Sequence, residues 1–334
     1  MTKTLSRREF GRLSMAGVAA FAVPQERRDP PGIYRYVHLD VFTDQRLAGN
    51  QLLVFTQPTG LTTDAMQGLT RESNYSECTF VFPPEQAGTD YRVRIFTRTA
   101  ETPFAGHPTI GTAFGLAHAR VIKAGTAKTV FGLGVGPTDI DLEWNGVDLA
   151  TAWMTQLKPT FGKTVDDGAA IAQAIGVDTA AVRLKPDRVP AGQEVNCGSN
   201  FFIVPLATRK AVDAAVLDRA KADAVFAAAG IQRRGIYVFS TEPAQDGATA
   251  YSRLLGTSGI EDPATGSAAG PAGSFIAKYG LVPQDRVGAI VFLQGVLVRR
   301  PSRIHVKIGM TGAEVTSVKV GGSAVVVGEG TMMP

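Results

Sequence analysis

The sequence predicts a protein built from two similar α/β halves with a cleft between them. Its 334 residues exceed the usual size of a single domain. One segment, consisting of an extended stretch, a Pro-x-x-Gly turn and a helix start, occurs at Glu101 and again at Glu261. Elsewhere, short apolar stretches separated by glycines predict many strands and turns. With 44% hydrophobic and 19% charged residues, the chain can form a large core.

The first 31 residues are expected to lie outside the fold, as an export signal followed by a linker. Ser6-Arg7-Arg8-Glu9-Phe10 is a twin-arginine pattern, an apolar run at 13–23 follows it, and Ala20-Phe21-Ala22 offers a small-residue cleavage site. These features in this order are typical of a secretory signal, and the paired arginines indicate the Tat export machinery. We therefore expect a periplasmic or secreted protein. A disordered basic tail is the alternative.

The excess positive charge of the chain is concentrated in this leader. The leader contributes +3 of the formal net charge of +4, so the remainder is nearly neutral. A nearly neutral body gives no reason to expect nucleic-acid binding. No stretch approaches the roughly 18 consecutive apolar residues of a membrane helix, so we expect no membrane association of the mature form.

The N-terminal half is predicted to combine several strands with two helices. Residues 34–42 alternate apolar and polar side chains, as a half-buried strand does. Apolar side chains at helical spacing predict a helix at 62–73 and another that starts near His107. Further strands are expected at 52–55, 78–82, 91–96, 130–135, 138–143 and 149–156.

A proline-containing seam at Lys158-Pro159 is the expected boundary between the halves. It places the N-terminal half at 32–157 and the C-terminal half at 158–325, with the final strands free to pack back on the first half. Helices are predicted at 165–175, at 211–229 and after residue 267, and strands at 235–240, 289–293 and 304–308.

The repeated segment forms two junctions between an extended stretch and a helix. Glu-Thr-Pro-Phe-Ala-Gly-His at 101–107 aligns with Glu-Asp-Pro-Ala-Thr-Gly-Ser at 261–267. A helix start carries unpaired N–H groups and the positive end of the dipole, and glycine lets a ligand approach the backbone. Gly106, Gly266 and Ser267 are therefore candidates for binding a carboxylate. Ordinary capping by the polar residue after each glycine is the alternative.

Two acidic residues are candidates for proton transfer. Glu77 stands directly before an apolar strand, where burial would raise its pKa towards the range used in general acid and base catalysis. Asp262 precedes the proline of the second junction and is a candidate to act together with Glu77. The alternatives are a solvated residue at a strand start and a turn-forming aspartate.

The sequence contains neither a metal-binding motif nor a disulfide framework. Its four histidines are dispersed without ligand spacing. The two cysteines, Cys78 and Cys197, lie far apart in the chain and are expected to be small apolar fillers. We therefore expect no metal and no other cofactor.

Three segments, in this order and spacing, resemble the phenazine-biosynthesis isomerase family, or PhzF-like proteins. They are residues 74–81, Gly-His-Pro-Thr at 106–109 and Glu-Asp-Pro-Ala-Thr-Gly-Ser-Ala at 261–268, within a similarity that extends over about residues 34–325. The resemblance implies the fold shared with diaminopimelate epimerase. This is an α+β fold of two similar halves, each a curled, mostly antiparallel, barrel-like sheet around a central helix, with the active site between them. It also implies a homodimer.

The resemblance implies roles for the candidate residues. Glu77 would shuttle the proton, while His107 and Asp262 would orient the substrate or assist the transfer. Gly106 and Ser267 would help to bind it.

The chain departs from the family pattern at three places. Asn50-Gln51 replaces the usual Asn-Pro, Cys78 stands where Thr is common, and Arg98 replaces a frequent Pro. None of these changes removes a catalytic group. The two-thiol epimerases of the same fold carry a cysteine before each junction glycine, where this chain has Ala105 and Thr265, so two-thiol racemisation is not expected.

These observations favour a cofactor-independent isomerase that moves a proton on a small carboxylated substrate, with a glutamate as general acid and base. The N–H groups at the helix starts would stabilise the charge that develops. The alternative is an exported small-molecule binding protein with the same cleft and no turnover, although a pure binder has no need of a base. The absence of a G-x-S-x-G motif argues against a serine hydrolase.

Overall fold

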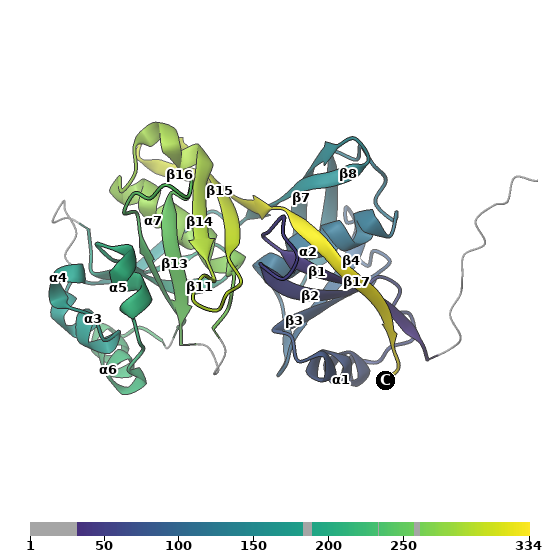
Figure 1. The fold of residues 1–334 in the computed structure, drawn as a ribbon, viewed down its shortest axis with the longest axis horizontal. Helices are drawn as coiled ribbons and strands as arrows, with labels where there is room; N and C mark the ends of the chain where they lie inside the picture. Colours follow the sequence, from purple (N-terminus) through teal and green to yellow (C-terminus); the bar gives the residue numbers. More distant parts are fainter. Residues whose placement is uncertain (1–31, 183–188, 233, 257–260) are drawn as a thin grey trace, which may run out of the picture.

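The computed structural model describes residues 32–182, 189–232, 234–256 and 261–334. The predicted export signal lies outside these residues. Within them, the chain forms an α+β fold of two halves that lie side by side, each with a curled sheet around one central helix (Figure 1). The fold class predicted from the sequence is confirmed.

The sheet of the N-terminal half contains the strands that precede residue 157 and also the last strand of the chain. Helix α1 (Thr63–Ser73) packs on one face of this sheet, and helix α2 (Gly106–His118) packs within its curve. The strands are β1 (Tyr34–Val41), β2 (Asn50–Phe55), β3 (Glu77–Phe82), β4 (Tyr91–Thr97), β5 (Glu101–Thr102), β6 (Lys128–Leu133), β7 (Gly136–Asn145), β8 (Asp148–Gln156) and β17 (Ala324–Met332).

The C-terminal half has the same layers. Helix α7 (Gly266–Tyr279) packs within the curve of the sheet, and four shorter helices cover its other face. These helices are α3 (Gly168–Ala174), α4 (Thr179–Val182), α5 (Arg209–Ala214) and α6 (Arg219–Ala229). The strands are β9 (Thr160–Val165), β10 (Gly192–Asn196), β11 (Asn200–Pro205), β12 (Ile236–Ser240), β13 (Ala250–Leu255), β14 (Ile290–Gln294), β15 (Ser302–Thr311) and β16 (Glu314–Gly322), and a 3₁₀ helix spans Gln284–Ala289.

The order of strand pairing repeats from one half to the other. From β17 through β1 to β8, successive neighbours pair antiparallel, antiparallel, parallel, antiparallel, parallel, antiparallel and antiparallel. From β9 to β16 the same order recurs. The central helix follows the fifth strand in each series, so the two junctions hold equivalent places. One structural unit is therefore used twice, as the repeated segment predicts.

The central helices are buried on nearly all sides. The first eleven residues of α2, Gly106 to Leu116, are all buried. Glycine allows this close packing, because a Cβ atom on Gly111 would lie 2.5 Å from the Leu52 side chain. In α7, a Cβ atom on Gly273 would similarly lie 2.8 Å from Val306. Helices that are apolar or small all round belong inside a fold, and here each forms the centre of its half.

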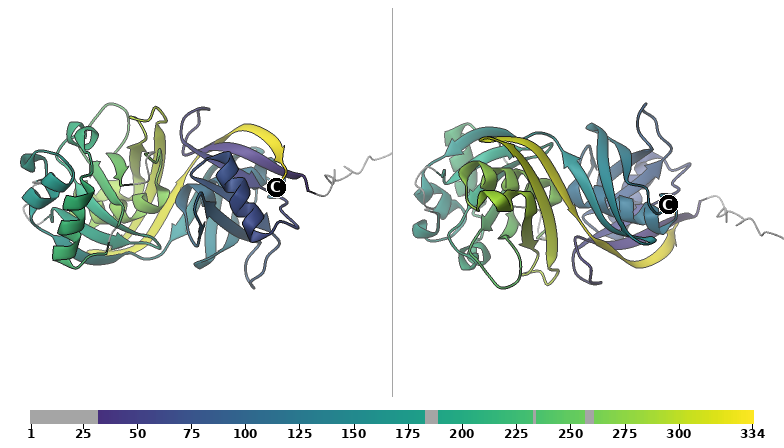
Figure 2. Two further views of the ribbon diagram at one scale, coloured as in Figure 1. Left: turned by 90° about the horizontal axis from the view of Figure 1, so that it is seen from below. Right: turned by 90° about the horizontal axis from the view of Figure 1, so that it is seen from above.

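Two strand pairings join segments that are far apart in the chain and connect the halves. β8 pairs antiparallel with β16, and β17 pairs antiparallel with β1. Both views in Figure 2 show β17, drawn in yellow, extending from the C-terminal half along the N-terminal half. Among the described helices there is none with the length and apolar content needed to cross a membrane.

Two helices differ from their predicted bounds. The helix predicted at 165–175 begins only at residue 168, because the Asp167 carboxylate caps it by accepting two backbone N–H groups at 3.0 Å. The helix predicted at 211–229 is interrupted between α5 and α6, where Asp218 caps the second helix at 3.1 Å. In both places a local capping side chain outweighs the apolar periodicity.

Candidate active site

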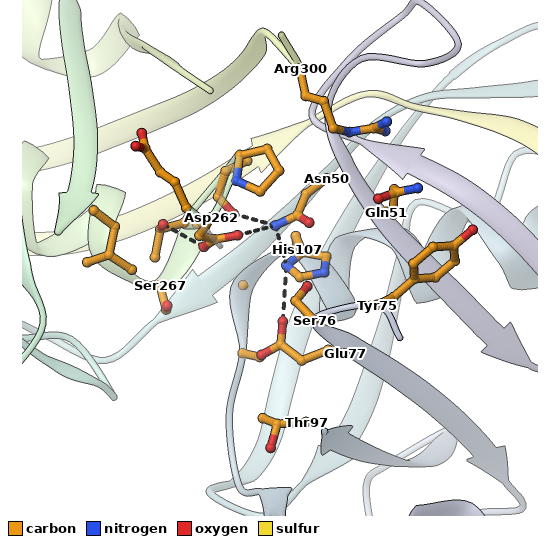
Figure 3. A pocket seen from close by; sticks show the side chains of 18 of the residues that line it. Asn50, Gln51, Tyr75, Ser76, Glu77, Thr97, His107, Asp262, Ser267 and Arg300 are labelled. Carbon is orange, nitrogen blue, oxygen red and sulfur yellow. Dashed lines mark hydrogen bonds and ion pairs between the residues drawn. The ribbon is translucent and has the colours of Figure 1, made fainter. Parts of the chain in front are cut away.

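A pocket of about 500 Å³ opens between the two halves (Figure 3). The N-terminal half lines it with the start of β3, the turn after β4 and the start of α2. The C-terminal half contributes mainly the segment that leads into α7. All the candidate residues selected from the sequence line this pocket: Glu77, Gly106, His107, Asp262, Gly266 and Ser267.

The starts of α2 and α7 pack directly against each other. A Cβ atom added to Gly106 would lie 2.5 Å from the Ser267 nitrogen and 2.6 Å from the Gly266 carbonyl carbon. One added to Gly266 would lie 2.8 Å from the Phe42 ring and 3.3 Å from the Gly106 Cα. The sequence interpretation assigned the missing side chains to ligand approach. The contact between the halves is what requires glycine.

Both helix starts lack a side-chain cap. The N-cap residues are Ala105 and Thr265, and within the described part of the chain neither side chain accepts a hydrogen bond from a helix N–H group. His107 and Ser267 lie inside the helices, so the capping role considered for them from the sequence is not observed. Two helix starts at one pocket thus combine their N–H groups and positive dipole ends there.

Glu77 is the first residue of β3 and lines the pocket (Figure 3). Its side chain is 19% exposed. Burial, and to a smaller extent the negative charge of Asp262, raises the pKa of Glu77 to about 8. A carboxyl group with this pKa can both release and accept a proton near neutral pH.

His107 contacts Glu77 from the second position of α2. Its Nδ1 atom lies 3.4 Å from Oε2 of Glu77 and 3.1 Å from Nδ2 of Asn50. The two hydrogens of the Asn50 amide go to shorter contacts, Oδ1 of Asp262 at 2.7 Å and the carbonyl of Ala264 at 2.9 Å. The ring proton of His107 is therefore assigned to Nδ1, facing Glu77. Burial lowers the pKa of His107 to about 3, so the ring is neutral.

Asp262 belongs to the other half and is held from several directions. Its Oδ1 accepts from Asn50, and its Oδ2 accepts from the Thr265 hydroxyl at 2.7 Å. The Gln294 amide donates to the Asp262 carbonyl and to the Thr265 hydroxyl, each at 2.9 Å. Burial raises the pKa of Asp262 to about 6, and hydrogen bonds from Thr265, Asn50 and the Ala264 backbone oppose the rise. Asp262 is thus the more acidic and the more rigidly held of the two carboxyl groups.

Three residues that hold the site were not selected from the sequence: Asn50, Thr265 and Gln294. Asn50 links the halves, because it contacts His107 from its own half and Asp262 from the other. In the sequence, Asn50 stands out only as part of the departure Asn50-Gln51. Asn50 keeps the asparagine of the family pattern Asn-Pro, and this agreement was the signal that could have identified it as a site residue.

Both cysteines are buried and free, Cys78 in β3 and Cys197 just after β10. Burial raises the pKa of Cys78 to about 11 and that of Cys197 to about 12, so neither is a thiolate near neutral pH. Among the described residues, no three His, Cys, Asp or Glu side chains form a group that could hold a metal ion.

Comparison with known proteins supplies the family. The family described as phenazine biosynthesis-like protein matches residues 39–330. An uncharacterised isomerase of Mesorhizobium japonicum is 33% identical over 308 residues, which cover 89% of this chain and 98% of that protein. The trans-2,3-dihydro-3-hydroxyanthranilate isomerase of Pseudomonas aeruginosa is 33% identical over 305 residues, which cover 89% of this chain and 99% of that protein.

A solved structure agrees with these sequence matches. The crystal structure of a Bacillus anthracis phenazine biosynthesis protein of the PhzF family has a TM-score of 0.77 at 23% identity, over 90% of this chain and 99% of that chain. The structural similarity to this protein supports the fold. The family membership is shown by the sequence matches. The resemblance seen in the three sequence segments is confirmed: the chain belongs to the phenazine biosynthesis-like family, in which these curated relatives are named isomerases.

Proposed function

We propose that this protein is an isomerase in which Glu77 moves a proton between two carbon atoms of a small carboxylated substrate. One observation carries the proposal: Glu77 lines the pocket between two helix starts, with its pKa raised to about 8. A general acid and base must gain and lose its proton near the working pH, and this position provides that property. The proposed reaction uses neither a metal nor another cofactor.

The proposed step begins with ionised Glu77. Its carboxylate removes a proton from a substrate carbon next to an unsaturated or carboxyl-bearing group, and the electron pair of the C–H bond shifts into that group. Glu77, now protonated, returns the proton to a second carbon, so the protein ends as it began. The Nδ1–H of neutral His107, 3.4 Å away, stabilises the glutamate whenever it is ionised.

The substrate carboxylate is proposed to bind at the two helix starts. Gly106, Gly266 and Ser267 contribute backbone N–H groups in the first turns of α2 and α7. Asp262, held by Asn50 and Thr265, then faces the substrate as a fixed hydrogen-bond acceptor. Binding and proton transfer are thereby divided between groups that need not move.

Hydrogen isotope exchange tests the proposal. The first compound to examine is trans-2,3-dihydro-3-hydroxyanthranilate, after the name of the Pseudomonas aeruginosa relative, followed by other small unsaturated carboxylates. The protonated Glu77 carboxyl can exchange its proton with solvent before it returns it, so in deuterium oxide the product should carry deuterium at one defined carbon. Glu77→Gln keeps the size of the side chain but cannot act as a base, so the rate should fall by about 10²–10⁴-fold while binding is largely retained.

Glu72→Gln serves as a matched control, because Glu72 is an exposed acid of the same half that does not line the pocket. Its rate should equal that of the unmodified protein. If ligands bind equally well with Glu or Gln at position 77 and neither form shows turnover, the protein is a small-molecule binding protein and the isomerase proposal fails.

Export by the Tat machinery and a homodimeric mature form remain proposals. The twin-arginine pattern supports the first and the family resemblance the second. Replacing Arg7 and Arg8 by lysine should leave the precursor in the cytoplasm, as fractionation would show. Mature protein in the periplasm of a Tat-deficient host would contradict the proposed route. Light scattering measures the oligomeric state.

A further inference from the structure

Two arginines occur among the described residues that line the pocket, and they differ in their partners. Arg300 is paired within the protein: it donates to Oδ1 of Asp40 at 2.5 Å and to the carbonyls of Ala48 at 2.6 Å and Gly49 at 2.8 Å. Asp40 is almost completely buried, so this ion pair is part of the protein interior. The charge of Arg300 is therefore already balanced by the protein.

Arg98 lacks such a partner. Its Nη1 donates to the neutral amide oxygen of Asn74 at 3.3 Å, and no carboxylate of the described chain is paired with it. The acid closest in sequence, Glu101, is occupied by Arg94 through two contacts of 2.6 and 2.9 Å. Glu261, another acid of the pocket wall, is likewise paired with Arg253 at 2.8 Å. Arg98 is thus a pocket cation that no carboxylate of the described residues balances.

The turn that carries Arg98 is well held. The Thr97 N–H donates to the Ala100 carbonyl at 2.8 Å, and the Thr97 hydroxyl oxygen accepts from the Ala100 N–H at 3.0 Å. The Gln67 amide from α1 donates to the Thr97 carbonyl at 2.8 Å. A fixed turn presents the arginine at a defined place, which favours recognition of a particular group over general attraction.

The position of this turn relative to Glu77 is also defined. Thr97 is the residue opposite Glu77 in the β3–β4 pairing, and Arg98 follows it directly. Figure 3 shows Thr97 and Asp262 on opposite sides of the Glu77 side chain. Arg98 is the next residue along the chain from Thr97, and its side chain lines the same pocket.

We propose that Arg98 binds a second carboxylate of the substrate, at the opposite end from the helix starts, so that the substrate is a dicarboxylate. This inference rests on the proposed function, in which the first carboxylate binds at the helix starts and Glu77 acts between the two. One guanidinium balances one negative charge and matches the two oxygens of a carboxylate in geometry. Since the other pocket arginine is already paired, a more highly charged group such as a phosphate would lack a second cation.

Matched pairs of small acids test the second carboxylate. Succinate, glutarate and adipate are compared with their monoamides by calorimetry at about pH 7. Each pair has the same size and differs by one charge, and the three lengths vary the carboxylate spacing. At one spacing the diacid should bind about tenfold more tightly than its monoamide, as one charge-assisted contact provides.

Three variants assign this preference to Arg98. In Arg98→Gln the ratio between diacid and monoamide should fall to about one, and in Arg98→Lys part of it should remain. Arg71→Gln removes an exposed charge from the neighbouring helix α1, away from the pocket lining, and should leave the ratio unchanged. Arg98 is itself only partly buried in a turn, so its replacement should leave the fold intact, which circular dichroism checks.

The outcomes separate this inference from the function on which it rests. If diacids and monoamides bind equally at every spacing, or if the preference persists in Arg98→Gln, the second carboxylate site is wrong and the isomerase proposal stands. If Arg98→Gln weakens both members of a pair equally, Arg98 provides only general attraction, and the inference is again wrong. If none of the acids binds, the carboxylate pocket itself fails, and this inference with it.

Discussion

In the N-terminal half the strand that pairs parallel with β2 and antiparallel with β4 begins with Glu77, whereas the equivalent strand of the C-terminal half, β12, begins with Ile236. The next residue in β12 is Tyr237, whose side chain is completely buried. Its hydroxyl group is hydrogen-bonded to the Ser252 hydroxyl at 2.8 Å and donates to Oε1 of Gln294 at 3.1 Å. The equivalent strands thus begin with an acid in one half and with an apolar residue followed by a structural hydrogen bond in the other.

The two junctions show the same division. Gln294, which Tyr237 supports, holds Asp262 and Thr265 in front of α7 through hydrogen bonds of 2.9 Å. At the first junction, His107 contacts the Glu77 carboxylate instead. Duplication of one unit therefore supplied two helix starts, and the halves then differ in chemistry: the N-terminal half provides the group with a pKa near neutral, and the C-terminal half provides a fixed acid.

Replacing the two acids one at a time tests this division and should give the largest effects. Asp262→Asn should lower kcat/KM by about tenfold, because its proposed role is to orient the substrate, whereas Glu77→Gln should lower it by about 10²–10⁴-fold. Rates with an identified carboxylated substrate, together with binding constants for both variants, provide the measurement. Normal turnover in Glu77→Gln combined with an inactive Asp262→Asn would exchange the assignments and make Asp262 the base.

Two glycine variants test how tightly the halves pack against each other at the helix starts. In Gly106→Ala the new methyl group meets backbone atoms of Gly266 and Ser267 at 2.5–2.7 Å, so the free energy of unfolding should fall by about 1–3 kcal/mol. Gly68→Ala is the matched control in the same half. Gly68 lies within α1 with nothing within 4 Å of the new atom, so this variant should be about 0.5–1 kcal/mol more stable.

Urea denaturation measures both glycine variants. Gly266→Ala should be affected less than Gly106→Ala, because its nearest contact is the edge of the Phe42 ring, which can shift, rather than backbone. Equal stability of Gly106→Ala and the unmodified protein would show that the halves separate easily at this contact. The glycines at the two helix starts would then be explained by the close approach of a ligand to the backbone, as predicted from the sequence.

The pH dependence of stability tests the raised pKa values of the two acids. Burial raises the pKa of Glu77 from 4.5 in the unfolded chain to about 8 when folded, so the folded state binds this proton more tightly. The resulting stability is fully present below the unfolded value and is lost as the pH rises towards 8. For Asp262 the same loss falls lower, between 3.8 and about 6.

Denaturation at several pH values should therefore show a different window for each half. Above about pH 6, Glu77→Gln should flatten the decline in stability, while Asp262→Asn should leave it in place. Glu72→Gln, the loss of an exposed acid, controls for the change in net charge. A decline that is identical in Glu77→Gln and the unmodified protein would contradict the raised pKa of Glu77.

Much of the fold could be predicted from local patterns, and the failures have physical causes. Strands with alternating side chains, such as β1, were predicted within a residue or two. β13 was missed because it is buried on both faces, so its sequence Ala-Tyr-Ser-Arg-Leu-Leu does not alternate. The final strands were expected to be free to pack back on the first half, but neither the bounds of β17 nor its partner was predicted, because its place depends on pairing with β1 at the other end of the chain. Nothing in residues 324–332 alone indicates that partner.

The sequence by itself determined that two related junctions exist and that each opens a helix with glycine, because helix starts and turns depend on neighbouring residues. It also placed Glu77 at the start of an apolar strand. Only the tertiary structure decided that Glu77, His107 and Asp262 share one pocket, since Asn50 joins groups 57 and 212 residues away. The raised pKa of Glu77 likewise depends on burial between both halves, and desolvation is a property of the assembled surroundings rather than of any local segment.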